Sequence, residues 1–82
     1  MDETALRLER IFREIFWTDA GPVSGKAREN TASWDSLAHL NLVLSIEQEF
    51  GIALADAEVV DMTAFGAALE IVRSKLQTRG QG

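Results

Sequence analysis

Apolar residues recur at steps of three and four in several segments of this chain, which is the spacing of one α-helical face. Residues 3–16 carry one such stripe, and residues 63–77 carry the most regular one. Residues 36–50 predict a helix between them, and residues 56–61 predict a further helix of one to two turns. The buried face expected for residues 36–50 comprises Leu37, Leu40, Val43 or Leu44, and Phe50. Residues 78–82 are predicted to be a frayed tail.

Several residue types in this sequence are suited to helix ends. Asp35 can cap the helix over residues 36–50, because its carboxylate can accept a free backbone N–H of the first turn. Gly51 can adopt the left-handed conformation that ends a helix. By the same logic, Asp56 is expected to cap the short helix, and Asp61 or Thr63 the last one.

The connection over residues 18–34 contains glycine, proline and serine, and we expect a long loop with at most one short turn. Val23 and Trp34 are its expected anchors to the core. Phe16 and Trp17 are expected to lean on the core where the first helix ends. No strand-like alternation is present, so the pattern predicts one all-α domain over residues 1–82, a small four-helix bundle with a long first loop.

Composition narrows the classes of function. Apolar residues make up 46% of the chain, enough to bury a core. The absence of cysteine excludes disulfides and thiolate metal sites. The net charge is −5, and residues 29–72 contain eight acidic residues and no lysine or arginine. Such a surface disfavours nucleic acid as a partner and favours a basic protein patch. The alternative is that these acids only keep the domain soluble.

Nothing in the sequence indicates a membrane protein. No stretch approaches the roughly 18 apolar residues that span a bilayer. Asp2 and Glu3 follow Met1, so the start of the sequence does not have the form of a signal peptide. We expect a cytoplasmic monomer.

Ser36 is the main candidate for chemistry, because it falls in the first turn of a predicted helix. The N–H groups and the helix dipole at that position favour an anion, such as a phosphate attached to the hydroxyl. Asp35-Ser36-Leu37, followed by a helix that ends Glu47-Gln48-Glu49-Phe50-Gly51-Ile52, resembles the acyl carrier protein family. The resemblance covers roughly residues 4–77.

The resemblance implies a cofactor and a set of partners. Ser36 would carry 4′-phosphopantetheine, transferred from coenzyme A by a phosphopantetheinyl transferase, with Asp35 and Leu37 flanking the attachment site. The arm would hold acyl groups as thioesters, and the protein would have no catalytic activity of its own. Further partners would be acyl-activating ligases, synthases or transferases with basic docking patches.

The same resemblance assigns residues to two further roles. The residues expected to select partners are Ala38, Asn41, Glu47, Glu49 and Asp56. The residues expected to belong to the core and to shelter an acyl chain are Leu40, Leu44, Val59, Met62 and Phe65.

Departures from the family pattern favour a specialised carrier. Trp34 stands where fatty-acid carriers usually have glycine, and we expect its indole to alter what docks beside the arm. Ala38, His39 and Asn41 replace residues that are commonly acidic or small and polar. We therefore expect a dedicated fatty-acyl, polyketide-like or envelope-modification pathway. The alternatives are a peptidyl or aminoacyl carrier, and a carrier-like interaction module that is never modified.

Two other chemistries are disfavoured. An esterase would need His39 to act as the base for Ser36, with a third group to orient it, and the nucleophile motif of hydrolases is missing. We expect His39 to be a surface or boundary residue. Asp56, Glu58 and Asp61 do not follow the pattern of a calcium-binding loop, so no metal site is predicted.

Overall fold

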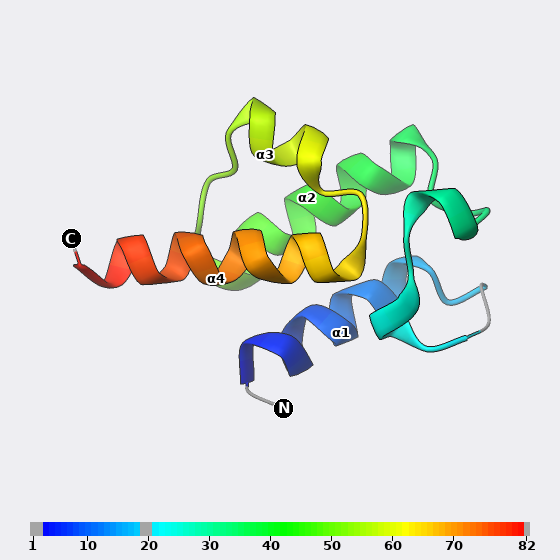
Figure 1. Ribbon diagram of the computed structural model, residues 1–82, viewed down its shortest axis with the longest axis horizontal. Coiled ribbons are helices and arrows are strands. Elements are labelled where there is room, and N and C mark those ends of the chain that lie inside the picture. The colour runs from blue at the N-terminus through cyan, green and yellow to red at the C-terminus, as the bar shows by residue number, and fades with distance from the viewer. Residues whose placement is uncertain (1–2, 19–20, 82) are drawn as a thin grey trace.

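The structure is a computed structural model that describes residues 3–18 and 21–81 (Figure 1). In the described parts of the chain it contains four α-helices and no strand. The helices are α1 (Glu3–Ile15), α2 (Ser36–Phe50), α3 (Asp56–Asp61) and α4 (Phe65–Gln81). Two short 3₁₀ turns, η1 (Val23–Gly25) and η2 (Arg28–Asn30), divide the first loop. The all-α prediction with a long first loop and a short third helix is confirmed, but the loop contains two short turns where one was expected.

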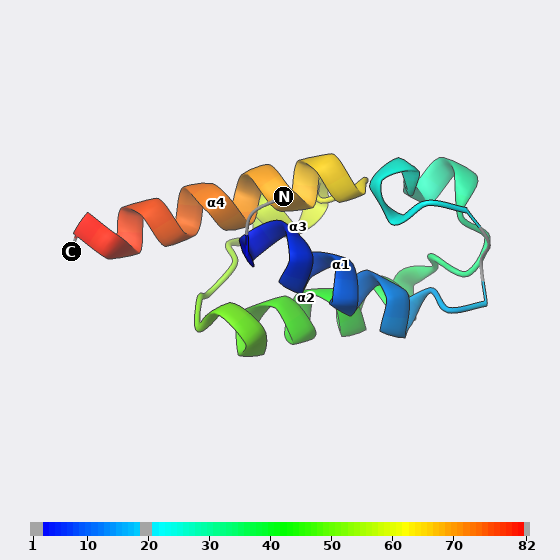
Figure 2. The same ribbon diagram turned by 90° about the horizontal axis from the view of Figure 1, so that it is seen from below.

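The three longer helices form the body of the molecule. Helix α1 packs against both α2 and α4, and α2 also contacts α4. The loop that carries η1 and η2 lies at the end of the molecule opposite the C-terminal half of α4, which extends beyond the other helices (Figures 1 and 2). No helix among the described residues is long and apolar enough to cross a membrane.

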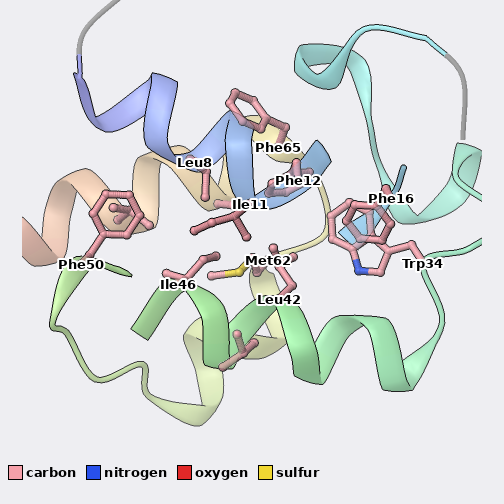
Figure 3. Close-up of a cluster of buried hydrophobic side chains, with 13 residues drawn as sticks. Leu8, Ile11, Phe12, Phe16, Trp34, Leu42, Ile46, Phe50, Met62 and Phe65 are labelled. Carbon is pink, nitrogen blue, oxygen red and sulfur yellow. The ribbon is translucent and has the colours of Figure 1, made fainter. Parts of the chain in front are cut away.

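The core is continuous from one end of the bundle to the other (Figure 3). Its fully buried side chains include Leu8, Phe12, Leu42, Ile46, Met62 and Val72. At the loop end, the ring centroid of Phe12 lies 5.5 Å from Phe16, 5.5 Å from Trp34 and 5.1 Å from Phe65. Val23 packs on the same cluster, so both predicted loop anchors are confirmed.

Backbone hydrogen bonds attach the first loop to the chain segment before α4. The Arg28 N–H donates to the Thr63 carbonyl at 2.9 Å, and the Phe65 N–H donates to the Lys26 carbonyl at 2.9 Å. Ala27 and Ala64 pair as an isolated antiparallel bridge between these two bonds. This pairing holds residues 63–64 outside the helix, and α4 begins at Phe65, so the prediction of a helix starting at residue 63, capped by Asp61 or Thr63, is wrong.

The other end of α4 also differs from the prediction. The helical backbone continues past residue 77 to Gln81, so residues 78–81 are not the tail that was predicted. Gly82 lies outside the described residues. The apolar periodicity of α4 ends at residue 77 because the helix projects beyond the bundle there, while its backbone hydrogen bonding continues.

Two smaller predictions are also corrected. Trp17 is 78% exposed and does not lean on the core, although Phe16 does. Ala55, rather than Asp56, occupies the capping position of α3, and Asp56 is the first helical residue. The Glu58 carboxylate accepts the Ala55 N–H at 2.8 Å and supplies the cap from inside the helix.

Candidate functional site at the start of helix α2

A tight turn leads the chain into α2. The Trp34 N–H donates to the Thr31 carbonyl, and the Asp35 N–H donates to the Ser33 carbonyl, each at 3.0 Å. The Asp35 backbone is extended, and its Oδ1 accepts the Ala38 N–H at 2.8 Å. At the other end, Gly51 adopts the left-handed conformation with φ of 64°. Both predicted helix ends are therefore confirmed.

Ser36 is the first residue of α2, and its side chain is exposed. Asp35 and Leu37 on either side are exposed as well. The first turn of α2 contains no acidic residue, so no carboxylate on the helix itself opposes an anion there. The positive end of the helix dipole favours a phosphate at this position. The geometry thus suits a hydroxyl that an external enzyme can reach and esterify.

Beneath this exposed turn, a buried hydrogen-bonded bridge runs through His39. Trp34 is 4% exposed, and its Nε1–H donates to His39 Nδ1 at 3.0 Å. His39 is 8% exposed, and its Nε2 lies 2.8 Å from the Val59 carbonyl oxygen of α3. An indole N–H can only donate and a carbonyl can only accept. The ring of His39 is therefore neutral, with its proton on Nε2.

This bridge corrects one prediction and removes a base. The prediction places His39 at the surface or its boundary, but His39 is buried, beside the predicted core anchor Trp34. Because both ring nitrogens of His39 are engaged, the ring is not available to activate Ser36. A Ser36–His39 esterase thus lacks its general base.

The sequence does contain a signal for this bridge. With Asp35 as the cap, Trp34 and His39 occupy the position before the cap and the fourth helical position. Apolar side chains at these two positions often pack together as a hydrophobic staple. Here the two rings are stacked with centroids 6.1 Å apart, and a hydrogen bond is added to the contact.

Three of the four leucines of α2 face away from the core, whereas the prediction placed them in it. Leu37, Leu40 and Leu44, which we call the outer face of α2, are 68%, 53% and 47% exposed. The residues of α2 that are buried instead are His39, Leu42, Val43, Ile46 and Phe50. Leu40 and Leu44 are therefore not core residues, whereas Met62 and Phe65 are, and Val59 is half-buried.

The predicted partner-selecting residues divide into free and engaged groups. Asn41 and Asp56 are exposed, whereas Ala38 packs against the core. The Glu47 carboxylate accepts the Leu54 N–H at 2.8 Å and so fixes the connection that follows α2. Glu49 Oε2 lies 2.6 Å from Arg7 Nε of α1.

Electrostatic interactions also fix α3 to α4. Lys75 Nζ lies 2.9 Å from Glu58 Oε1. The hydrogen bond from the Ala55 N–H and the neighbouring Lys75 ammonium both lower the pKa of the Glu58 carboxyl from its usual value. Among the residues that the structure describes, no three His, Cys, Asp or Glu side chains come together as a metal site.

A cavity of about 580 Å³ lies at the end of α1, away from the predicted site residues. Its walls include Arg13, Phe16, Trp17, Pro22 and Val23.

A scan against protein-family models finds no match for this chain.

Proposed function

We propose that this protein is an acyl carrier protein in which Ser36 carries a 4′-phosphopantetheine arm. The observation that carries the proposal is the exposed Ser36 hydroxyl within Asp35-Ser36-Leu37, at the first residue of the second helix of a four-helix chain. The capping hydrogen bond from the Ala38 N–H to Asp35 supports it, since this bond fixes the turn that presents the serine.

The residues around Ser36 fit the phosphate end of such an arm. A phosphodiester on the hydroxyl would lie at the positive end of α2, whose first turn holds no acidic residue, and the neighbouring Asp35 carboxylate is bound to the Ala38 N–H. When bound, the arm supplies a thiol that can hold acyl groups as thioesters, and the chain has no cysteine to supply one. Residues of the chain itself then have only to present Ser36 and to select the enzymes that act on the arm.

The outer face of α2 is the favoured surface for those enzymes. Its three leucines are exposed beside Ser36, and Asn41 lies between two of them along the helix. No charged residue occurs from Ser36 to Ile46 when histidine is counted as neutral. Asp56 and Asp61 on α3 are exposed and supply the negative charge that a basic docking patch would meet. Apolar contact with α2 and charge attraction at α3 would together select the partner.

The test is the intact mass of the purified protein after incubation with coenzyme A, Mg²⁺ and a broad-specificity phosphopantetheinyl transferase. The expected result is the gain of one phosphopantetheine. Ser36→Ala should abolish the gain. Ser74→Ala, which removes an exposed serine from α4, is the matched control and should retain it.

A folded protein that gains no mass would refute the carrier proposal and leave an unmodified interaction module as the better explanation. A gain that survives Ser36→Ala would place the modification elsewhere in the chain. Circular dichroism of each variant establishes that it is folded before the mass is read.

A further inference from the structure

Helix α3 depends on contacts outside itself more than any other helix of the molecule. It has six residues, and none of them is fully buried. A helix of this length does not form by itself, because nucleation is unfavourable and few hydrogen bonds follow it. Its apolar contribution to the core comes from Val59, which is half-buried. Met62, which ends α3, is fully buried, and specific hydrogen bonds and an ion pair hold the helix itself in place.

Three such contacts act at different points along α3. The Glu47 carboxylate binds the Leu54 N–H just before the helix begins, and Glu58 pairs with Lys75 of α4. The Glu58 and Lys75 side chains are 29% and 31% exposed, so water and salt screen this pair. The third contact joins His39 Nε2 to the Val59 carbonyl. This carbonyl belongs to the last turn of α3, where it also accepts the Met62 N–H at a longer distance of 3.4 Å.

The contact through His39 differs from the other two because a buried hydrogen bond anchors the His39 ring at its far side. His39 Nδ1 accepts the Trp34 indole N–H. The Trp34 ring lies against Phe16, just after α1, and against Phe12 of α1, with centroid distances of 4.9 Å and 5.5 Å. A hydrogen bond shielded from water is stronger than an exposed one. The bridge thus connects the carbonyl end of α3 through α2 to the aromatic core.

We infer that His39 acts as a latch, a side chain whose hydrogen bond to Val59 holds α3 closed against α2. Helix α3 is then a lid that opens when this bond breaks. The neutral imidazole holds the Val59 carbonyl against α2, and the Trp34 indole holds the imidazole in the orientation that this requires. Releasing the Nε2 bond frees α3 to move away from α2 while α1, α2 and α4 keep their own packing. Opening of this lid exposes the apolar core near Val59 and Met62.

Two polar substitutions distinguish the two hydrogen bonds of the bridge, the one from Trp34 and the one to Val59. The side-chain oxygen of His39→Asn can take the place of Nδ1 as the acceptor for Trp34, but its amide is too short to reach Val59. The longer His39→Gln places an amide N–H near the position of Nε2, from which it can donate to the Val59 carbonyl. The two variants share burial and polarity, so each is the control for the other.

Native-state amide hydrogen exchange, followed by NMR on the unmodified chain, reports where each variant opens. In His39→Asn we expect at least tenfold faster exchange in α3, with unchanged rates for the slowest amides of α1 and α4. His39→Gln should restore the protection of α3. Equal acceleration in all helices of His39→Asn would overturn the inference, because His39 would then be an ordinary core residue. Unchanged exchange in α3 would overturn it as well.

A second readout asks whether opening exposes the core. The neutral dye Nile red becomes fluorescent in apolar surroundings, and we expect stronger fluorescence with His39→Asn than with His39→Gln or the unaltered protein. Equal fluorescence of the three would contradict opening at α3. Neither measurement requires modification of Ser36, so the latch and the carrier proposal stand or fall separately.

Discussion

Helices α1 and α2 contribute similar amounts of core, yet they distribute their remaining residues differently. In α1 the side chains away from the core are largely charged, with Leu6 as an exposed exception. In α2 both sides are apolar: Leu42, Val43 and Ile46 are buried, while Leu37, Leu40 and Leu44 are exposed.

The difference between the two helices indicates that the sequence of α2 meets a requirement in addition to folding. Apart from Leu6, burial explains the pattern of α1, because one apolar stripe facing the core is all that a bundle helix needs. It does not explain three exposed leucines within two turns of α2. Exposed apolar residues that gather on one surface mark a site of interaction. Folding alone therefore does not account for the sequence of the outer face of α2, next to Ser36.

The sharpest test of this comparison replaces one leucine in each helix. Leu8 of α1 is fully buried, so Leu8→Ala should lower the free energy of unfolding by about 2–5 kcal/mol. Leu40→Ala, the matched change on the outer face of α2, should alter it by about 0.5 kcal/mol or less. Urea denaturation measures both. Comparable losses in the two variants would mean that Leu40 belongs to the core after all.

A smaller effect is expected at the start of α2, where the helix depends on its cap. Asp35→Ala removes the acceptor of the Ala38 N–H and should cost about 0.5–2 kcal/mol of stability in the same assay. Asp35→Asn is the control, since an asparagine side chain accepts the same bond and should leave stability nearly unchanged. A loss with Asn as large as that with Ala would assign the effect to charge and not to capping.

The smallest effect on stability is expected in α3, which has neither the burial of α1 nor the length of α2. The pKa of Glu58 is lowered in the folded state by the Ala55 N–H and by Lys75. Its carboxylate therefore stabilises the fold above the pKa of about 4.3 expected in the unfolded chain, and this contribution is lost as the pH falls through the folded value.

The stability difference between the unaltered protein and Glu58→Gln should consequently be largest at neutral pH and shrink on acidification. Urea denaturation at a series of pH values measures this difference. A difference that grows toward acid pH would contradict the assignment of a lowered pKa.

Much of the local structure follows from the sequence because it depends on neighbouring residues. Asp35 caps α2 and Gly51 ends it as predicted, since a cap and a left-handed glycine act within one helical turn. The stripe of Leu8, Ile11 and Phe12 locates the core side of α1 because the alternative side is charged. Ser36 was placed at the start of α2 for the same local reasons.

Residues whose roles depend on distant partners were not predictable in this way. Glu47 appeared to be a docking residue, but it binds the Leu54 N–H, so reversing its charge would disturb the fold as well as any partner. Glu49 pairs with Arg7, which lies 42 residues earlier in the chain. Periodicity could not decide which leucines of α2 face the core, because apolar residues occupy both of its sides.

The sequence by itself determined the helical class, the helix ends formed by local contacts and the exposed turn that carries Ser36. Only the tertiary structure decided which side of α2 is buried, where α4 begins and what His39 does. The start of α4 depends on pairing between residues 26–28 and 63–65, and His39 depends on the Val59 carbonyl of another helix. The physical reason is the same in each case: capping and turn energies act between neighbours in sequence, whereas burial and buried hydrogen bonds are fixed only when distant segments meet.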